Sequence, residues 1–167
     1  VARARERMRL AREKRPKPMT DTKVLASWNG LMISGLCIGY QALGERAWLD
    51  AAVRAGAFLR KEMIRDGRVA VRWREGEAAH KGVLNDYAHV VAAFLDLYES
   101  TFDPQWLAEA LRLSKTAIDL FYDEAGGGFF FTAKDHERLI ARGKTGFDQA
   151  VPSGNGVMAM NLLRVAE

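Results

Sequence analysis

Three apolar segments of the chain begin with polar clusters whose side chains can bind ligands or move protons. Residues 28–30 (Trp-Asn-Gly) open the first segment, residues 85–87 (Asn-Asp-Tyr) the second, and residues 153–155 (Ser-Gly-Asn) the third. Asn, Asp and Ser are also common helix starters, because their side chains accept hydrogen bonds from unpaired backbone N–H groups. If the three segments are helices around a common centre, their polar starts meet at one end, where a pocket can form.

Asp86 is the best candidate for a functional carboxylate, because it begins an apolar helix where a ring of helices would open. Asp148 and Asp21 stand just ahead of the other two apolar helices and are candidates for a second acid at the same rim. The alternative is that each Asp only caps a helix and complements its dipole. His80, after a predicted strand, is a candidate acid or base, and His89 lies on the same helix face as Asp86.

Aromatic and amide side chains accompany these acids. Aromatic rings can stack on the faces of sugar rings, although such residues are more often part of the core. Amides can hydrogen-bond sugar hydroxyls, and they can also start helices. The residues predicted to contact a substrate are Trp28, Asn29, Trp73, Asn85, Tyr87 and Asn155.

Other kinds of site find little support in the sequence. No cluster of His and Cys has metal-ligand spacing, so we expect neither a metal nor a cofactor. The glycine run at residues 126–128 is a turn rather than a phosphate loop, because no Lys-Ser/Thr pair follows it. Ser153 lacks the context of a nucleophilic serine. The single Cys37 has no disulfide partner within the chain, which favours a reducing compartment and predicts a cytoplasmic protein.

Composition and charge describe a globular domain. The 167 residues are 49% hydrophobic and 28% charged, and no apolar stretch is long enough for a convincing membrane span. The net charge of +4 is concentrated in residues 1–23, which hold nine Lys or Arg and three acidic residues. This arm has no aromatic residue to stack on bases, so we expect a solvated helix rather than a nucleic-acid contact.

Hydrophobic periodicity divides the chain into repeated units. Residues 1–18 are predicted to form a basic helical lead-in, and residues 19–167 a fragment of an α/α barrel. Expected inner helices span about 27–43, 84–100 and 153–167, and expected outer helices span about 46–64 and 104–121. Short β-hairpins are predicted at residues 68–77 and at residues 129–132 with 138–141. The order predicts an all-α fold, either a toroid or a solenoid, and the β excursions favour a partial toroid of about three helical hairpins.

Five stretches also resemble a known family: residues 21–33 (DTKVLASWNGLMI), 84–88 (LNDYA), 94–103 (FLDLYESTFD), 127–130 (GGFF) and 152–155 (PSGN). In this order they resemble the spermatogenesis-associated, thioredoxin-domain-containing proteins. The resemblance implies a thioredoxin-like domain upstream and an (α/α)6 barrel of the six-hairpin glycosidase type. N-acylglucosamine 2-epimerases and unsaturated glucuronyl hydrolases are similar to that barrel in fold. About half of the barrel would lie in this chain, so it is expected to be a piece of a longer protein.

The chain departs from the family pattern at two acidic pairs. Asp21-Thr22 and Asn85-Asp86 stand where the family typically has Asp-Asp. One hypothesis is acid–base chemistry on a sugar by a glycosidase or an epimerase-like enzyme, and a glycosidase needs two carboxyl groups roughly 5–9.5 Å apart. The alternative is a non-catalytic binding or scaffold module that serves the thioredoxin-like domain. In either case a partial barrel is expected to self-associate or to expose an apolar flank.

Overall fold

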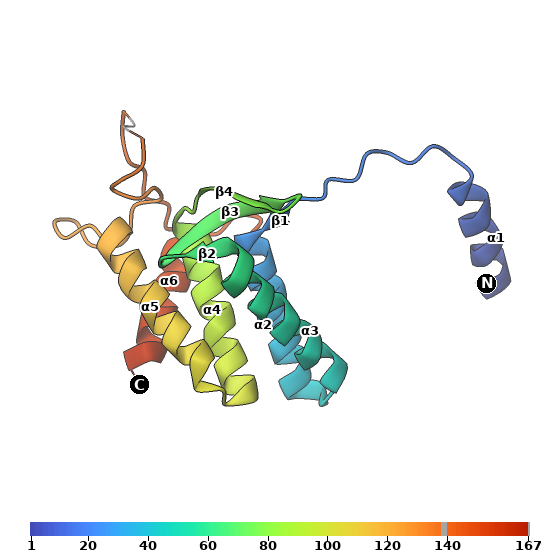
Figure 1. Cartoon of the computed structure of the whole chain (residues 1–167), viewed down its shortest axis with the longest axis horizontal. Coiled ribbons are helices and arrows are strands. Elements are labelled where there is room, and N and C mark those ends of the chain that lie inside the picture. Colours follow the sequence, from blue (N-terminus) through green and yellow to red (C-terminus); the bar gives the residue numbers. More distant parts are fainter. Residues whose placement is uncertain (138–139, 167) are drawn as a thin grey trace.

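The computed structural model describes residues 1–137 and 140–166, and its core is a row of three apolar helices. The central one, α4 (Leu84–Thr101), packs against α2 (Ala26–Leu43) and α6 (Gly154–Ala166). Many side chains of α4 are fully buried, among them Tyr87, Phe94 and Leu97. Figure 1 shows these helices side by side, with their starting ends toward the small sheet.

Two amphipathic helices cover the outside of this row. α3 (Arg46–Phe58) continues into the π-helical turn η1 (Leu59–Met63) and packs on α2 and α4. α5 (Pro104–Phe121) packs mainly on α4, and Asp103 caps it by accepting a hydrogen bond from the Gln105 N–H at 3.0 Å. Inner and outer helices therefore alternate along the chain, and the predicted all-α fold, a partial α/α toroid, is confirmed.

A small antiparallel sheet lies at the starting ends of α2 and α4. Its central strand β3 (Arg68–Arg74) pairs along one edge with β4 (Glu77–Lys81) and along the other with β1 (Val24–Leu25) and β2 (Ile64–Arg65). The β3–β4 turn at Glu75 and Gly76 has positive φ at both residues, the mirror-image geometry that matches hairpin twist. Val69 is buried, so one face of β3 packs on the helices and the other faces outward.

The basic lead-in forms helix α1 (Ala2–Glu13), none of whose residues is buried. Figure 1 shows α1 apart from the other helices, at the end of an extended connector. Pro16 and Pro18 lie in that connector, where they prevent the helix from continuing. Within the described residues, no helix is both long and apolar enough to cross a membrane.

In the described part of the chain, the first arm of the second predicted hairpin (residues 129–132) is not a strand. Residues Phe129–Thr132 have no strand of their own, and only a single bridge joins Phe129 to Tyr122. The reason is that Asn155 binds both the N–H and the C=O of Phe129, which replaces the partner strand. In the predicted second strand, residues 138 and 139 lie outside the described part of the chain.

Helix α2 is less buried than its sequence predicts. Trp28, Met32 and Ile38 are each about 60% exposed, because no helix in the described part of the chain packs on that flank of α2. On α6, Met160 and Leu163 are exposed in the same way. An apolar flank of the kind expected for a partial barrel is therefore present at both ends of the helix row.

Candidate functional site

The start of α4 holds the acid that the sequence singles out. Asp86 is only 3% exposed, and its two carboxylate oxygens accept hydrogen bonds from two different helix starts. Oδ2 accepts from the Val83 N–H at 3.0 Å, which closes the first turn of α4, and Oδ1 accepts from the Ser27 N–H at 3.3 Å in the first turn of α2. Because the first N–H groups of a helix have no partner inside it, one carboxylate satisfies a donor of each helix.

Asn85 makes the corresponding connection to the third helix. Its Oδ1 accepts a hydrogen bond from the Gly154 N–H at 3.1 Å, at the first residue of α6. A side chain at position 154 would disturb this hydrogen bond, because a Cβ there would collide with the same Asn85 oxygen. The adjacent residues Asn85 and Asp86 thus connect α4 to α6 on one side and to α2 on the other. The three helix starts gather at one end of the row.

His89 lies one turn further along α4 and is also buried. Its Nε2 is 3.2 Å from the carbonyl oxygen of Pro152, just ahead of α6, whereas its Nδ1 has no hydrogen-bond partner within the described residues. Burial lowers the pKa of His89, which favours a neutral ring that donates from Nε2. In the described part of the chain His89 forms no hydrogen bond with Asp86, so the two are not an acid–base pair here.

Electrostatically, Asp86 stands out among the carboxylates. Burial raises its pKa from 3.8 to about 6, although the N–H groups of Val83 and Ser27 favour the ionised form and oppose this rise. A carboxyl group with a pKa near 6 can both hold and release a proton close to neutral pH. Asp86 therefore has the titration behaviour of an acid–base group and the hydrogen bonds of a helix cap.

The other two candidate acids lie apart from Asp86. Asp21 is exposed, accepts a hydrogen bond from the Lys23 N–H at 3.2 Å and pairs with the Lys23 ammonium group at 3.2 Å. The Lys23 N–H, followed by the Lys23 side chain, lowers the pKa of Asp21. Asp148 is exposed and accepts from the Ser153 N–H at 2.8 Å. Among the described residues, neither Asp21 nor Asp148 forms a hydrogen bond or an ion pair with Asp86.

The three aromatic residues predicted to contact a substrate have different surroundings. Trp28 projects from the first turn of α2 and is 63% exposed. Trp73 is half-buried and packs edge to face on Phe58, with ring centroids 5.3 Å apart. Tyr87 is buried, and its hydroxyl accepts a hydrogen bond from the Val69 N–H at 3.2 Å. Only Trp28 presents a largely free ring face.

The remaining amides bind the backbone. The Asn29 side chain donates to the Leu25 carbonyl at 2.9 Å, at the start of its own helix. Asn155 accepts from the Phe129 N–H at 2.7 Å and donates to the carbonyls of Phe129 at 2.9 Å and Thr145 at 3.0 Å. Asn155 therefore anchors the loop that precedes α6.

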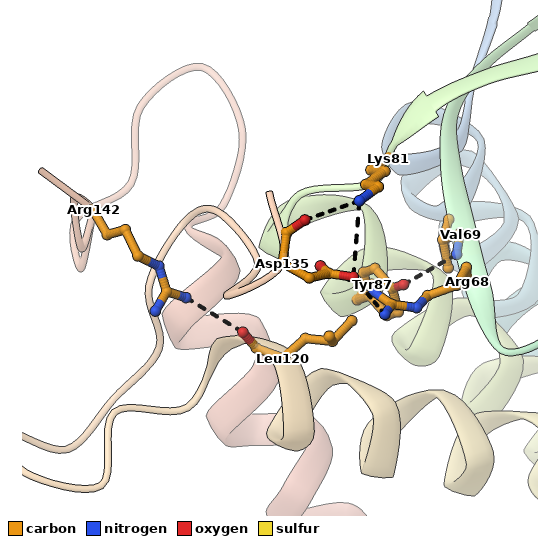
Figure 2. Close-up of polar contacts among 7 residues, drawn as sticks. All are labelled: Arg68, Val69, Lys81, Tyr87, Leu120, Asp135 and Arg142. Carbon is orange, nitrogen blue, oxygen red and sulfur yellow. Dashed lines mark hydrogen bonds and ion pairs between the residues drawn. The ribbon is translucent and has the colours of Figure 1, made fainter. Parts of the chain in front are cut away.

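The structure also shows a cluster of charged residues that the sequence analysis missed. Figure 2 shows the side chains of Arg68 and Lys81 pointing toward Asp135, which lies in the loop before α6. The Arg68 guanidinium is 2.7 Å from Asp135 Oδ2, and the Lys81 ammonium donates to the Asp135 carbonyl at 2.9 Å. With Tyr87 they line a cavity of about 230 Å³. The Arg65-Asp-Gly-Arg68 sequence could have predicted only that Arg65 lies opposite Arg68, since a two-residue Asp-Gly turn places its flanking residues opposite each other, and it carries no signal for Asp135.

His80, the fourth catalytic candidate, lies beside this cluster on β4. Its side chain is exposed and its backbone has a φ of 63°, in the left-handed region. It lines a hollow on the outward side of the sheet together with Arg65, Arg68 and Lys81. Across the described residues, no three His, Cys, Asp or Glu side chains are grouped so that they could hold a metal ion.

Comparison with known proteins gives relatives over nearly the whole chain. Human spermatogenesis-associated protein 20 is 40% identical over 96% of this chain, and the mouse protein of the same name is equally similar. The chain is similar to one segment of spermatogenesis-associated protein 20. It spans about a fifth (22%) of the length of the human protein. An uncharacterised Caenorhabditis elegans protein is 31% identical over 97% of the chain. No protein-family model matches the chain.

Solved structures similar to this chain are α/α barrels. A sugar epimerase from a ruminal bacterium matches 88% of the chain with a TM-score of 0.71 and 15% identity, over 39% of its own length. Cellobiose 2-epimerase from Spirochaeta thermophila matches 86% of the chain with a TM-score of 0.64 and 15% identity, over 37% of its length. A GH76 α-mannanase from Bacteroides thetaiotaomicron matches 69% with a TM-score of 0.56 and 20% identity. At these identities the likeness concerns the fold.

Proposed function

We propose that the chain forms part of an α/α toroid that binds a carbohydrate and carries out acid–base chemistry on it. The observation that carries this proposal is the gathering of three inner-helix starts around Asp86, whose pKa lies near 6. Similarity in fold to sugar epimerases and a mannanase supports the choice of a sugar as the ligand. The cytoplasm remains the proposed location.

Each candidate residue has a distinct role in this proposal. Asp86 holds or releases the proton, because its pKa is the one that burial moves toward neutrality. Trp28 stacks on the sugar ring, since its indole is largely exposed at the first turn of α2. Asp148 or Asp21 supplies the second carboxylate from the exposed side of the rim, and His80 is an alternative proton carrier.

A sugar-binding screen followed by a turnover assay tests the proposal. Neutral, amino and acidic sugars are screened on a glycan array and by thermal shift, and hits are assayed for epimerisation and for hydrolysis. We expect Trp28→Ala to remove the thermal shift without changing the unliganded Tm, because Trp28 has few contacts to lose. Asp86→Asn is expected to keep sugar binding and abolish turnover. No binding of any sugar, or full turnover by Asp86→Asn, contradicts the proposal.

A second candidate function is a non-catalytic binding or scaffold module for a thioredoxin-like domain. The observation that favours it is that Asp86, Asp21 and Asp148 all accept hydrogen bonds from backbone N–H groups, as caps do. This alternative predicts saturable binding to a separately produced thioredoxin-like domain, measured by sedimentation, and no sugar turnover. The turnover assay of the wild-type chain therefore separates the two functions.

A further inference from the structure

The outward face of the sheet carries a cluster of cations at one end. Arg65 on β2 and Arg68 on β3 are directly opposite each other in the antiparallel register. Lys81 on β4 is opposite Ala70, two residues along β3 from Arg68, so all three cations lie on the same face. Like charges directly opposite each other destabilise a sheet. Such an arrangement gains stability from a bound anion.

These cations surround a hollow of about 270 Å³. Ala70 and Ala79 contribute small side chains between the charged ones, which leaves room above the sheet. The ionisable residues that line the hollow are Arg65, Arg68, His80 and Lys81, and none of its lining residues is acidic. The hollow is therefore a basic depression.

Asp135 neutralises only part of this charge from the adjoining loop. Its carboxylate contacts the Arg68 guanidinium at 2.7 and 3.4 Å and lies 3.9 Å from the Lys81 ammonium. The Arg68 side chain, as the largest cause, lowers the pKa of Asp135, so this carboxylate is ionised at neutral pH. Within residues 1–137 and 140–166, Arg65 forms no ion pair. Three cations facing one carboxylate leave a local charge of +2.

We propose that this hollow binds a phosphate group, either as inorganic phosphate or as part of a small phosphate ester. A phosphate monoester carries about −1.5 to −2 charges at neutral pH, which balances the local charge, whereas a carboxylate balances half of it. The planar guanidinium groups of Arg65 and Arg68 suit paired hydrogen bonds to phosphate oxygens. This site lies on the outward side of the sheet and does not depend on the proposed sugar chemistry.

Calorimetric titration in a phosphate-free buffer at low salt tests the proposal. The probes are inorganic phosphate, glucose 6-phosphate, glucuronate and glucose. We expect both phosphates to bind, glucuronate to bind about tenfold more weakly or worse, and glucose not to bind. Equal affinities for the two phosphates would mean that the site recognises the phosphate group alone. Tighter binding of glucose 6-phosphate would mean that the site also contacts the sugar part of the ester. Both results support a phosphate site.

Charge variants provide matched controls. Arg65→Gln and Lys81→Gln are expected to weaken phosphate binding about tenfold each, because each removes a charged donor. Arg46→Gln on α3 removes an exposed arginine that pairs with Asp50 and is expected to leave binding unchanged. Circular dichroism confirms that each variant is folded.

Asp135→Asn gives a prediction of opposite sign. It keeps the size of the side chain but removes the internal competitor for Arg68 and Lys81, so phosphate binding should tighten several-fold. The proposal is overturned if the wild-type chain binds no phosphate, or if glucuronate binds as tightly as phosphate. Equal losses in Arg65→Gln and Arg46→Gln, or weaker binding by Asp135→Asn, would overturn it as well.

Discussion

Two neighbouring side chains on α4 each connect this helix to a different inner helix. Asn85 accepts a hydrogen bond from α6, and Asp86 accepts one from α2. An amide suits position 85, because it supplies the acceptor without charge. A second carboxylate beside the buried Asp86 would place two like charges close together and raise the cost of ionisation. The neutral amide at position 85 therefore has a physical role at this site.

The buried Asp86 makes stability depend on pH in a specific direction. Its folded pKa of about 6 lies above the ordinary 3.8, so the folded state binds more protons between these pH values. Stability from this group is greatest below pH 4 and falls by about 3 kcal/mol as the pH rises through 6. Urea unfolding of the wild type and Asp86→Asn, from pH 4 to 7.5, should show Asp86→Asn gaining relative stability as the pH rises. A difference that is independent of pH would contradict the burial argument.

Asn155 is expected to contribute more to stability than Asn29, although both begin inner helices. Asn155→Ala removes three hydrogen bonds and leaves the N–H and C=O of the buried Phe129 without partners, so we expect a loss of about 2–4 kcal/mol. Asn29→Ala removes one bond at a helix start and should cost less than about 1 kcal/mol. Chemical denaturation compares the two. Equal losses would mean that Asn155 does not anchor its loop.

At the scale of elements, the crossing of α2 and α4 depends on Gly30. A Cβ at this position would lie 2.6 Å from the His89 carbonyl oxygen, so the two helix backbones touch there. Gly35 lies on the same helix, and a Cβ there would meet nothing within 4 Å. One glycine is required by packing and the other is not.

Alanine substitutions at these glycines should therefore have opposite signs. Gly30→Ala forces α2 and α4 apart and is expected to destabilise the fold by about 3 kcal/mol. Gly35→Ala replaces a flexible glycine inside a helix at a position where a Cβ meets no other atom. It should therefore stabilise the fold by roughly 0.5–1 kcal/mol. Thermal unfolding of both variants checks the pair. A destabilised Gly35→Ala would imply a contact at that position.

Apolar periodicity was sufficient to predict the helices and their inner and outer order, because burial against neighbours determines that pattern. It did not predict the exposed flank of α2, since an apolar position in the sequence does not show whether a helix that would cover it is present. It also missed the loop before α6, where one side chain, Asn155, replaces a strand. The Asp86 cap was predictable from its place at a helix start. The cluster of Arg68, Lys81 and Asp135 depends on contacts between residues more than 50 positions apart.

On the scale of the whole molecule, apolar surface remains uncovered at both ends of the helix row. Trp28 and Met32 are exposed on α2. At the other end, a groove of about 500 Å³ runs between α5 and α6 and is lined by Ile118, Leu162 and Leu163, among others. Contiguous apolar patches of more than a few hundred Å² on a protein surface usually mark contact sites. The similar barrels extend well beyond the part that this chain matches, which covers 39% of the ruminal sugar epimerase.

These two surfaces should make the chain self-associate in a concentration-dependent way. Sedimentation velocity is expected to show an average mass that rises with concentration, and Met32→Lys with Leu163→Lys should shift the chain toward monomer. Both side chains are about 60% exposed, so the double variant should keep its Tm within about 2 °C. Met8→Lys adds a charge to a 67% exposed site on α1, which Figure 1 shows apart from both surfaces, and should leave association unchanged. If the wild type is monomeric at every concentration, or if Met8→Lys reduces association equally well, these flanks are not where copies meet.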